Sequence, residues 1–187
     1  MKRVLWGGLA LCFLLLTGCG GREPENTILV RILAVDRVEV GLRLTAYSGV
    51  QDLGKTPGVC LTGEGATLET ALKALRTKGN GYPALTHMTQ LVVGEGVPLQ
   101  PLLESLVTGR ETGYSATLWR VSGAAAEVLA GAKTPVERLE ALEQNGGAPP
   151  PNILDGLVSL KREGQVSLPV LLPAGEDLAR GGDRRGG

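Results

Sequence analysis

Hydrophobic and polar residues follow two different spacings along the chain, and the changes between them predict the order of its elements. Residues 27–35 are almost continuously apolar, as in a central strand covered on both faces, with Arg31 as the interruption. After a turn expected near Asp36 and Arg37, apolar residues occupy every second position of residues 38–46, the period of a half-buried strand. The two runs predict a hairpin.

Shorter apolar runs predict further strands at residues 59–62, 87–96, 114–121 and 166–172. Residues 48–58, which precede the first of these strands, are rich in turn formers and predict a loop that tolerates insertions. Pro169 places the last strand at a sheet edge, because proline offers no N–H to a neighbouring strand. Residues 174–187 are mainly glycines, arginines and acids, which predicts a disordered tail.

Two segments between the strands have helical spacing. Apolar residues recur three and four positions apart in two stripes: Leu68, Ala71, Leu72 and Leu75, and then Leu99, Leu102, Leu103 and Leu106. Thr67 can cap the first helix, and Gly79 and Gly109 follow the stripes as stop signals. We expect both helices to bury these stripes against the sheet.

Further helices are expected from residue 124 onward. Residues 134–137 combine a capping threonine, a proline at the first helical position and a glutamate three residues after the cap. After a rigid connector at residues 146–152, Asn152 can cap a short helix that extends through residue 160. Elements that alternate after an initial hairpin predict an α+β (mixed α/β) fold, a single domain with a mixed central sheet flanked by helices.

The amino terminus predicts an export signal. Lys2 and Arg3 precede an apolar run at residues 4–16, which is shorter than the roughly 20 residues of a membrane-spanning helix. The run ends in residues 16–19, Leu-Thr-Gly-Cys, which resemble a bacterial lipobox. Cys19 is therefore the candidate site of lipidation, since a thiol can be alkylated by a diacylglyceryl donor. The alternatives are an ordinary secretory signal with a chance cysteine and an uncleaved anchor.

This reading divides the chain into a cleaved lipoprotein signal peptide (1–18), a lipid-anchored tether (19–26), one domain (27–173) and the tail (174–187). A diacylglyceryl group carries two acyl chains such as palmitate, and two chains hold a protein at a membrane durably where one holds it marginally. The expected location is the outer face of a bacterial membrane.

Composition excludes several classes of function. Lys plus Arg equals Asp plus Glu at 19 each, so no basic field attracts nucleic acid. The aromatic residues after the signal are Tyr47, Tyr82, Tyr114 and Trp119, too few for a platform that stacks single-stranded bases. If Cys12 leaves with the signal and Cys19 is lipidated, as predicted, Cys60 has no partner for an internal disulfide.

Residues that could carry catalysis occur singly. His87 is the only histidine, so the chain cannot build a histidine-based triad or a multi-histidine metal site, and we expect a polar residue satisfied at the start of a strand. Cys60 has no cationic cluster near it in the sequence, which favours a structural thiol over a nucleophile. No catalytic residue is expected.

Two further patterns are interpreted as structural. Residues 94–101 open a helix but lack the spacing of a phosphate loop or dinucleotide site, which favours a turn over an anion site. Glu137, Glu140 and Glu143 recur three apart beside Arg138 and predict a solvated helix face rather than a catalytic carboxylate pair. We expect no cofactor and no metal.

The order of many weak motifs is more specific than any one of them. The lipobox is followed by Arg22-Glu23 and then, in order, by ILAVD, GATLETALKAL, LTHMTQLVVGEG, PLLESLV, GYSATLWRVSGAAAEVL, TPVERLEALEQNGG and NILDGLVSLKREGQVSLPVLLP. This succession resembles the Ger(x)C family of spore-germination lipoproteins, the C subunits of nutrient germinant receptors. The resemblance covers residues 16–173 and only the amino-terminal domain of that family.

Two features depart from that family. Gly20-Gly21 stands where its members usually have Trp-Asp after the lipid-bearing cysteine. Members also continue through further domains beyond the point that corresponds to Pro173, so the sequence is expected to be a short paralogue, a split gene or a truncated reading frame.

The resemblance implies a lipid-anchored, non-catalytic subunit that works beside two membrane-embedded receptor subunits in the inner membrane of a spore. Arg22 and Glu23, just after the anchor, are candidate contacts for such a partner. The alternative function is a lipid-anchored small-molecule binding protein that delivers a ligand to a transporter, which requires a cleft with convergent polar groups. A surface enzyme is disfavoured because the sequence has no hydrolase signature.

Overall fold

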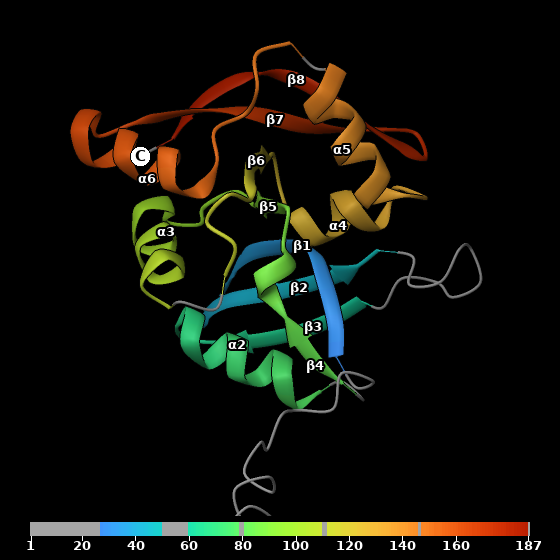
Figure 1. The fold of residues 1–187 in the computed structure, drawn as a ribbon, viewed down its shortest axis with the longest axis vertical. Helices are drawn as coiled ribbons and strands as arrows, with labels where there is room; N and C mark the ends of the chain where they lie inside the picture. The colour runs from blue at the N-terminus through green and yellow to red at the C-terminus, as the bar shows by residue number, and fades with distance from the viewer. Residues whose placement is uncertain (1–26, 50–59, 79–80, 110–111, 146, 187) are drawn as a thin grey trace, which may run out of the picture.

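One mixed sheet runs through the protein, with helices on both of its faces (Figure 1). The computed structural model describes residues 27–49, 60–78, 81–109, 112–145 and 147–186. The sheet has 8 strands in the order β3-β2-β1-β5-β6-β7-β8, with β4 beside β1 and off this path. This architecture confirms the predicted α+β fold, a single domain with a mixed central sheet.

The strands are β1 (Thr27–Val38), β2 (Gly41–Ser48), β3 (Cys60–Gly65), β4 (Tyr82–Ala84), β5 (Gln90–Val93), β6 (Thr117–Val121), β7 (Val166–Ala174) and β8 (Asp177–Gly186). The helices are α2 (Leu68–Thr77), α3 (Leu99–Thr108), α4 (Ala125–Ala130), α5 (Pro135–Asn145) and α6 (Ile153–Glu163), with a 3-10 helix η2 (Leu85–His87).

β1 and β2 form the antiparallel hairpin that the alternating pattern predicts, but its turn lies farther along the chain. Val38 pairs with Gly41, so the turn is at residues 39–40 rather than near Asp36 and Arg37. Asp36 is only 5% exposed within β1, where its carboxylate accepts hydrogen bonds from backbone N–H groups of α4. A polar residue that is satisfied inside the fold is thus mistaken for a turn residue in the sequence.

Four neighbouring strands, β1, β5, β6 and β7, are parallel, and their connections place helices on both faces. α2, α3 and α6 bury their apolar residues on one face, whereas α4 and α5 cover the other face around the fully buried Trp119. β1 serves both cores, with Leu33 on the first face and Ile32 on the second. This position explains the nearly continuous apolar run at residues 27–35.

α2 and α3 follow the predicted stripes with one exception. Thr67 caps α2, since its hydroxyl accepts from the N–H of Thr70 and the Thr70 hydroxyl accepts from the N–H of Thr67. Leu72 is only half-buried, while the other three members of its stripe and the whole stripe of α3 are buried. The predicted stop at Gly79 lies outside the described residues.

α6 begins as predicted and ends later than expected. The side chain of Asn152 accepts a hydrogen bond from the N–H of Asp155, which is the expected cap. The helix continues through Glu163 and ends at Gly164, whose φ of 70° is the left-handed conformation that glycine adopts easily.

The end of the chain corrects the predicted tail. Asp177–Gly186, expected to be disordered, form β8 antiparallel to β7. β7 therefore lies between β6 and β8 and is not an edge strand, although it contains Pro169. The register shifts between Pro169 and Leu171, an irregularity that accommodates the missing N–H. Main-chain pairing requires no apolar composition, and Leu178, the leucine of β8, is fully buried.

Candidate binding groove

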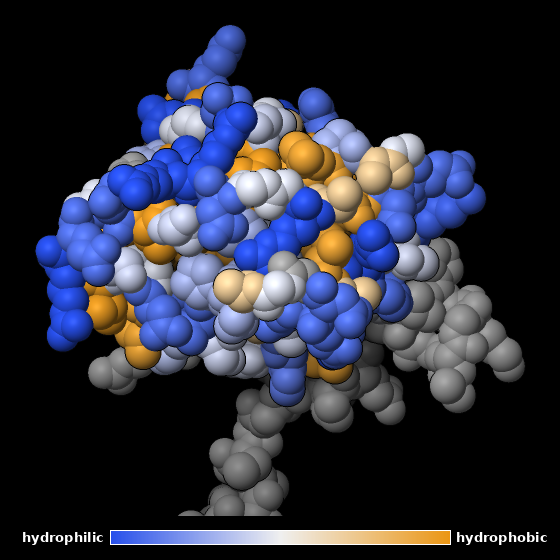
Figure 2. Space-filling view, turned by 90° about the horizontal axis from the view of Figure 1, so that it is seen from above, coloured by the Kyte–Doolittle hydropathy of each residue, from blue (hydrophilic) through white to orange (hydrophobic). Residues whose placement is uncertain are grey.

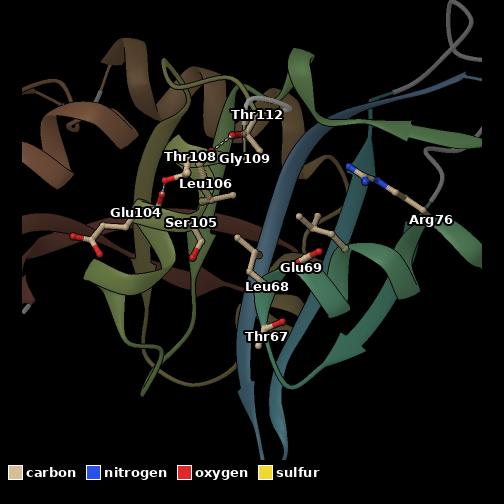
Figure 3. A pocket seen from close by; sticks show the side chains of 11 residues that line it. Thr67, Leu68, Glu69, Arg76, Glu104, Ser105, Leu106, Thr108, Gly109 and Thr112 are labelled. Carbon is tan, nitrogen blue, oxygen red and sulfur yellow. Dashed lines mark hydrogen bonds between the residues drawn. The ribbon is translucent and has the colours of Figure 1, made fainter.

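An open groove of about 670 Å³ separates α2 from α3 on one face of the sheet (Figure 3). α2 packs against β2 and β3, whereas α3 packs against α6, so the two helices have different neighbours. The groove is lined by Thr67, Leu68, Glu69, Leu72 and Arg76 and, across from them, by Glu104, Ser105, Leu106, Thr108, Gly109 and Thr112. The volume falls within the range of small-molecule sites, about 300–1,000 Å³.

Charged side chains stand at the margins of this groove. Glu104 accepts a hydrogen bond from Gln100 at 3.3 Å and pairs with Lys161 of α6, also at 3.3 Å. These two neighbours lower the pKa of the Glu104 carboxyl, Gln100 first. On the opposite wall the guanidinium of Arg76 lies 5.3 Å from the centre of the Tyr82 ring, a cation–π distance.

The wall contributed by α3 is held by two threonines. The Thr108 hydroxyl donates to the Glu104 carbonyl and the buried Thr112 hydroxyl donates to the Leu106 carbonyl, both at 2.7 Å. The bond from Thr112 satisfies a carbonyl of the last helical turn, which lacks an N–H partner within the helix, whereas the bond from Thr108 is an i to i−4 side-chain bond inside α3. Leu68 and Leu106 point into the space between the walls (Figure 3).

The lining of the groove combines polar side chains with leucines. The lining residues supply hydroxyls, two carboxylates and one guanidinium, but neither a histidine nor a thiol. The groove lies between two helices that are separate in the sequence. Of its residues, the sequence pattern identifies Thr67 as a cap, Gly109 as a stop signal, and Leu68, Leu72 and Leu106 as members of the apolar stripes.

The acids of α5 do not form the solvated face that their spacing predicts. Arg31 donates to Glu140 at 2.5 Å, and the Glu143 carboxylate accepts from Gln90 and from Thr117, each at 2.8 Å. Gln90 in turn accepts a bond of 2.6 Å from the indole N–H of Trp119. Glu137 alone of the three is exposed. The other two join α5 to β1, β5 and β6, a role that only the tertiary arrangement reveals.

The glycine-rich segment after β5 is a packed turn. The N–H of Gly94 donates to the Val35 carbonyl, and the carboxylate of Glu95 accepts from the N–H of Gly123. Asp36 fills the adjacent space, where its two oxygens accept from the N–H groups of Ala125 and Ala126 at 2.5 and 3.0 Å. The N–H groups of Gly94, Gly123, Ala125 and Ala126 are thus already bonded within the chain.

His87 and Cys60, the histidine and the cysteine of the described residues, are not among the residues that line the groove. His87 is exposed in η2, before the strand at whose start it was expected. Cys60 is the first residue of β3 and is exposed as a whole. Its thiol is nevertheless partly buried, which raises the pKa of the thiol, and a hydrogen bond with Tyr47 opposes this increase. Burial also raises the pKa of Tyr47, whose hydroxyl donates to the Ala126 carbonyl at 3.1 Å.

The predicted lipidation site, Cys19, and its neighbours Arg22 and Glu23 lie outside the described residues. Within the described part of the chain, no helix has the length and apolar character needed to cross a membrane. The same part contains no cluster of histidine, cysteine and acidic side chains able to hold a metal ion.

Comparison with known proteins identifies the domain. No curated protein and no solved structure matches the chain. Residues 20–172 match the model of a family described as the spore germination protein N-terminal domain. Because this match spans most of the chain, the protein belongs to the spore germination protein family through this N-terminal domain, and it has a role in spore germination.

Proposed function

We propose that the protein is a lipid-anchored, non-catalytic subunit of a nutrient germinant receptor, and that it acts by contacting membrane-embedded receptor subunits at the outer face of the spore inner membrane. One observation carries the proposal: the family match begins at residue 20, directly after the cysteine of the lipobox-like segment. The germination domain thus directly follows the predicted lipidation signal.

Action by contact is supported by the kinds of side chain on the surface. The groove between α2 and α3 offers hydroxyls and carboxylates beside leucines, a combination suited to shape recognition and hydrogen bonding. Glu95 and Asp36, the carboxylates nearest the glycine-rich turn, are occupied by backbone donors.

Co-purification from spore membranes tests the proposal. The protein carrying a tag should capture two integral membrane subunits of one receptor, and deletion of its gene should slow or abolish nutrient germination. Capture of no receptor subunit, together with unchanged germination, would contradict a working receptor subunit.

The groove also supports the alternative function, delivery of a small molecule to a transporter. A ligand that binds the folded state raises the melting temperature, and the shift grows with the logarithm of the ligand concentration once this exceeds Kd. Ser105→Trp, which introduces a bulky ring into the groove, should abolish such a shift, whereas Ser159→Trp on α6, outside the groove, should preserve it. A shift that persists in Ser105→Trp would place the ligand elsewhere.

A further inference from the structure

A second pocket lies where the end of α6, the start of β7 and the end of β8 meet. β7 follows α6 directly and β8 returns antiparallel to β7, so β8 ends beside α6 (Figure 1). The pocket measures about 430 Å³, within the range of small-molecule sites, about 300–1,000 Å³. We use the name α6–β8 pocket for this site, whose polar lining residues are Ser159, Glu163, Gln165, Ser167 and Arg185. None of these residues lines the groove between α2 and α3.

The polar side chains of the α6–β8 pocket are not occupied by other parts of the protein. Within the described residues, none of the five forms a hydrogen bond or an ion pair through its side chain. By contrast, Arg31, Arg43 and Arg138 each pair with an acid. Positions 146 and 187, the undescribed positions nearest to these residues in the sequence, are glycines and carry no charged side chain. The pocket therefore offers a ligand several polar groups that have no partner in the described chain.

The pocket is lined by one acid and one base. Glu163 is the last residue of α6, where the partial negative charge of the helix end adds to that of its carboxylate. Arg185 pairs with Ser167 in the antiparallel ladder, so both side chains point to the same face of the sheet. Glu163 and Arg185 do not form an ion pair with each other. A ligand that pairs with both must therefore carry a positive and a negative group that are separated in space.

Less polar residues complete the site. The buried Val166 and the rings of Pro149 and Pro151 line the same pocket. The side of the molecule on which β8 lies presents mostly hydrophilic side chains with apolar ones among them (Figure 2). The two serine hydroxyls and the Gln165 amide can each donate and accept hydrogen bonds, which suits the N–H and the carbonyl of a peptide group.

We propose that the α6–β8 pocket binds a small zwitterion of the dipeptide class. Its ammonium group pairs with Glu163, its carboxylate pairs with Arg185, and the serines and Gln165 bond to its peptide group. The two charged ends of an extended dipeptide are separated by about 7 Å, at about 3.6 Å per residue, which matches an acid and a base that do not reach each other. This binding requires neither the lipid anchor nor a receptor subunit, so it stands or falls separately from the proposed function.

Titration of the full chain in detergent micelles with glycylglycine, followed by amide NMR spectra, tests the site. N-acetyl-glycylglycine lacks the ammonium group and glycylglycinamide lacks the carboxylate, so each is a matched probe with one charge. We expect glycylglycine to shift the amide signals of Gln165, Val166 and Ser167, and each probe with one charge to bind about threefold to fivefold more weakly, the effect of losing one exposed ion pair. Equal affinity for all three compounds, or no shift at these residues, would overturn the proposal.

Two neighbouring arginines supply matched variants. Arg185→Gln should weaken the binding of glycylglycine by the same factor of about three to five and leave the binding of glycylglycinamide unchanged, because that probe has no carboxylate to lose. Arg184 is also exposed, but it pairs with Leu168 in the ladder and does not line the pocket. Arg184→Gln should therefore leave the binding of both compounds unchanged. Equal losses in the two variants would show a general effect of charge and contradict a site at Arg185.

A pair of bulky substitutions separates this pocket from the groove. Ser159→Trp introduces a large ring into the α6–β8 pocket and should abolish the shifts caused by glycylglycine. Ser105→Trp does the same to the groove between α2 and α3 and should leave those shifts intact. Shifts that survive Ser159→Trp and disappear in Ser105→Trp would place the dipeptide in the groove and refute the assignment to the α6–β8 pocket.

Discussion

At Gly94, a single added Cβ would lie 2.3 Å from Oδ1 of Asp36, closer than any ordinary contact. That oxygen accepts the N–H of Ala125, so the glycine leaves room for the carboxylate that caps α4. The same position was marked in the sequence only as part of a glycine-rich turn. The glycine is needed because the buried carboxylate of Asp36 on β1 approaches it, and Asp36 is 58 residues away from Gly94 in the chain.

Gly94→Ala should therefore destabilise the domain by about 1–3 kcal/mol, because the clash displaces Asp36 and leaves buried donors unsatisfied. Urea denaturation measures the loss. Gly182→Ala is the matched control, since nothing lies within 4 Å of a Cβ there, and it should change stability by less than about 0.5 kcal/mol. Equal effects of the two substitutions would contradict the role assigned to Gly94.

Tyr47 makes stability depend on alkaline pH. Burial raises the pKa of its phenol above the ordinary value of 10.0, so the unfolded chain loses this proton at a lower pH than the folded one. The stabilising contribution is complete below about pH 10 and declines as the pH rises above that value. Tyr47→Phe should lessen the decline in denaturation midpoint between pH 9 and pH 11, and Tyr114→Phe, with Tyr47 intact, should not.

At the scale of elements, the spacing of apolar residues and the capping residues predicted most of the fold, because both signals depend on residues that are close in the sequence. The hairpin, both leucine-rich helices and the cap of α6 follow from residues within one or two turns of each other. What the sequence did not reveal depends on distant partners. β8 can form although it is polar, because its neighbour β7 supplies the hydrogen bonds. Glu140 and Glu143 are bonded to the sheet because β1, β5 and β6 supply donors. The groove likewise lies between two helices that are separate in the sequence.

β8 can be distinguished from a disordered tail by one substitution. Leu178 is fully buried among residues of the core formed by α4 and α5. Leu178→Ala should therefore lower the free energy of unfolding by about 2–5 kcal/mol. Leu172 on β7 is 42% exposed, so Leu172→Ala should lower it by well under half of that amount. Chemical denaturation gives both values, and no effect at Leu178 would support a disordered end after all.

The two helices that wall the groove should differ in their response to truncation. Leu103 of α3 is fully buried, and Leu103→Ala should cost about 2–5 kcal/mol. Leu72 of α2 is half-buried and lines the groove, so Leu72→Ala should cost about 1 kcal/mol. Chemical-denaturation curves measure both losses of stability. A loss at Leu72 as large as that at Leu103 would mean that the groove is closed in solution.

At the scale of the whole molecule, the position of β1 in the sheet determines where the proposed anchor would be connected to the fold. β1 is the first strand of the described residues and a central strand of the sheet. A force applied at its start is therefore transmitted directly to the core. Its two neighbours differ: β2 is antiparallel and β5 parallel. An anchored lipid would thus be joined through residues 19–26 to a central strand of the fold, rather than to a peripheral loop.

Cys19→Ala tests the anchor on which this picture depends. In the lipobox reading, the thiol at this position is the only one that a diacylglyceryl donor can alkylate, so its loss should abolish metabolic labelling with palmitate and shift the protein from the membrane fraction to the soluble one. Cys60→Ala is the matched control: it removes an exposed thiol of β3 and should leave both labelling and membrane association intact. Labelling that persists in Cys19→Ala and disappears in Cys60→Ala would place the lipid on the domain itself, and labelling absent from the wild-type chain would leave the family's germination role to a protein without this anchor.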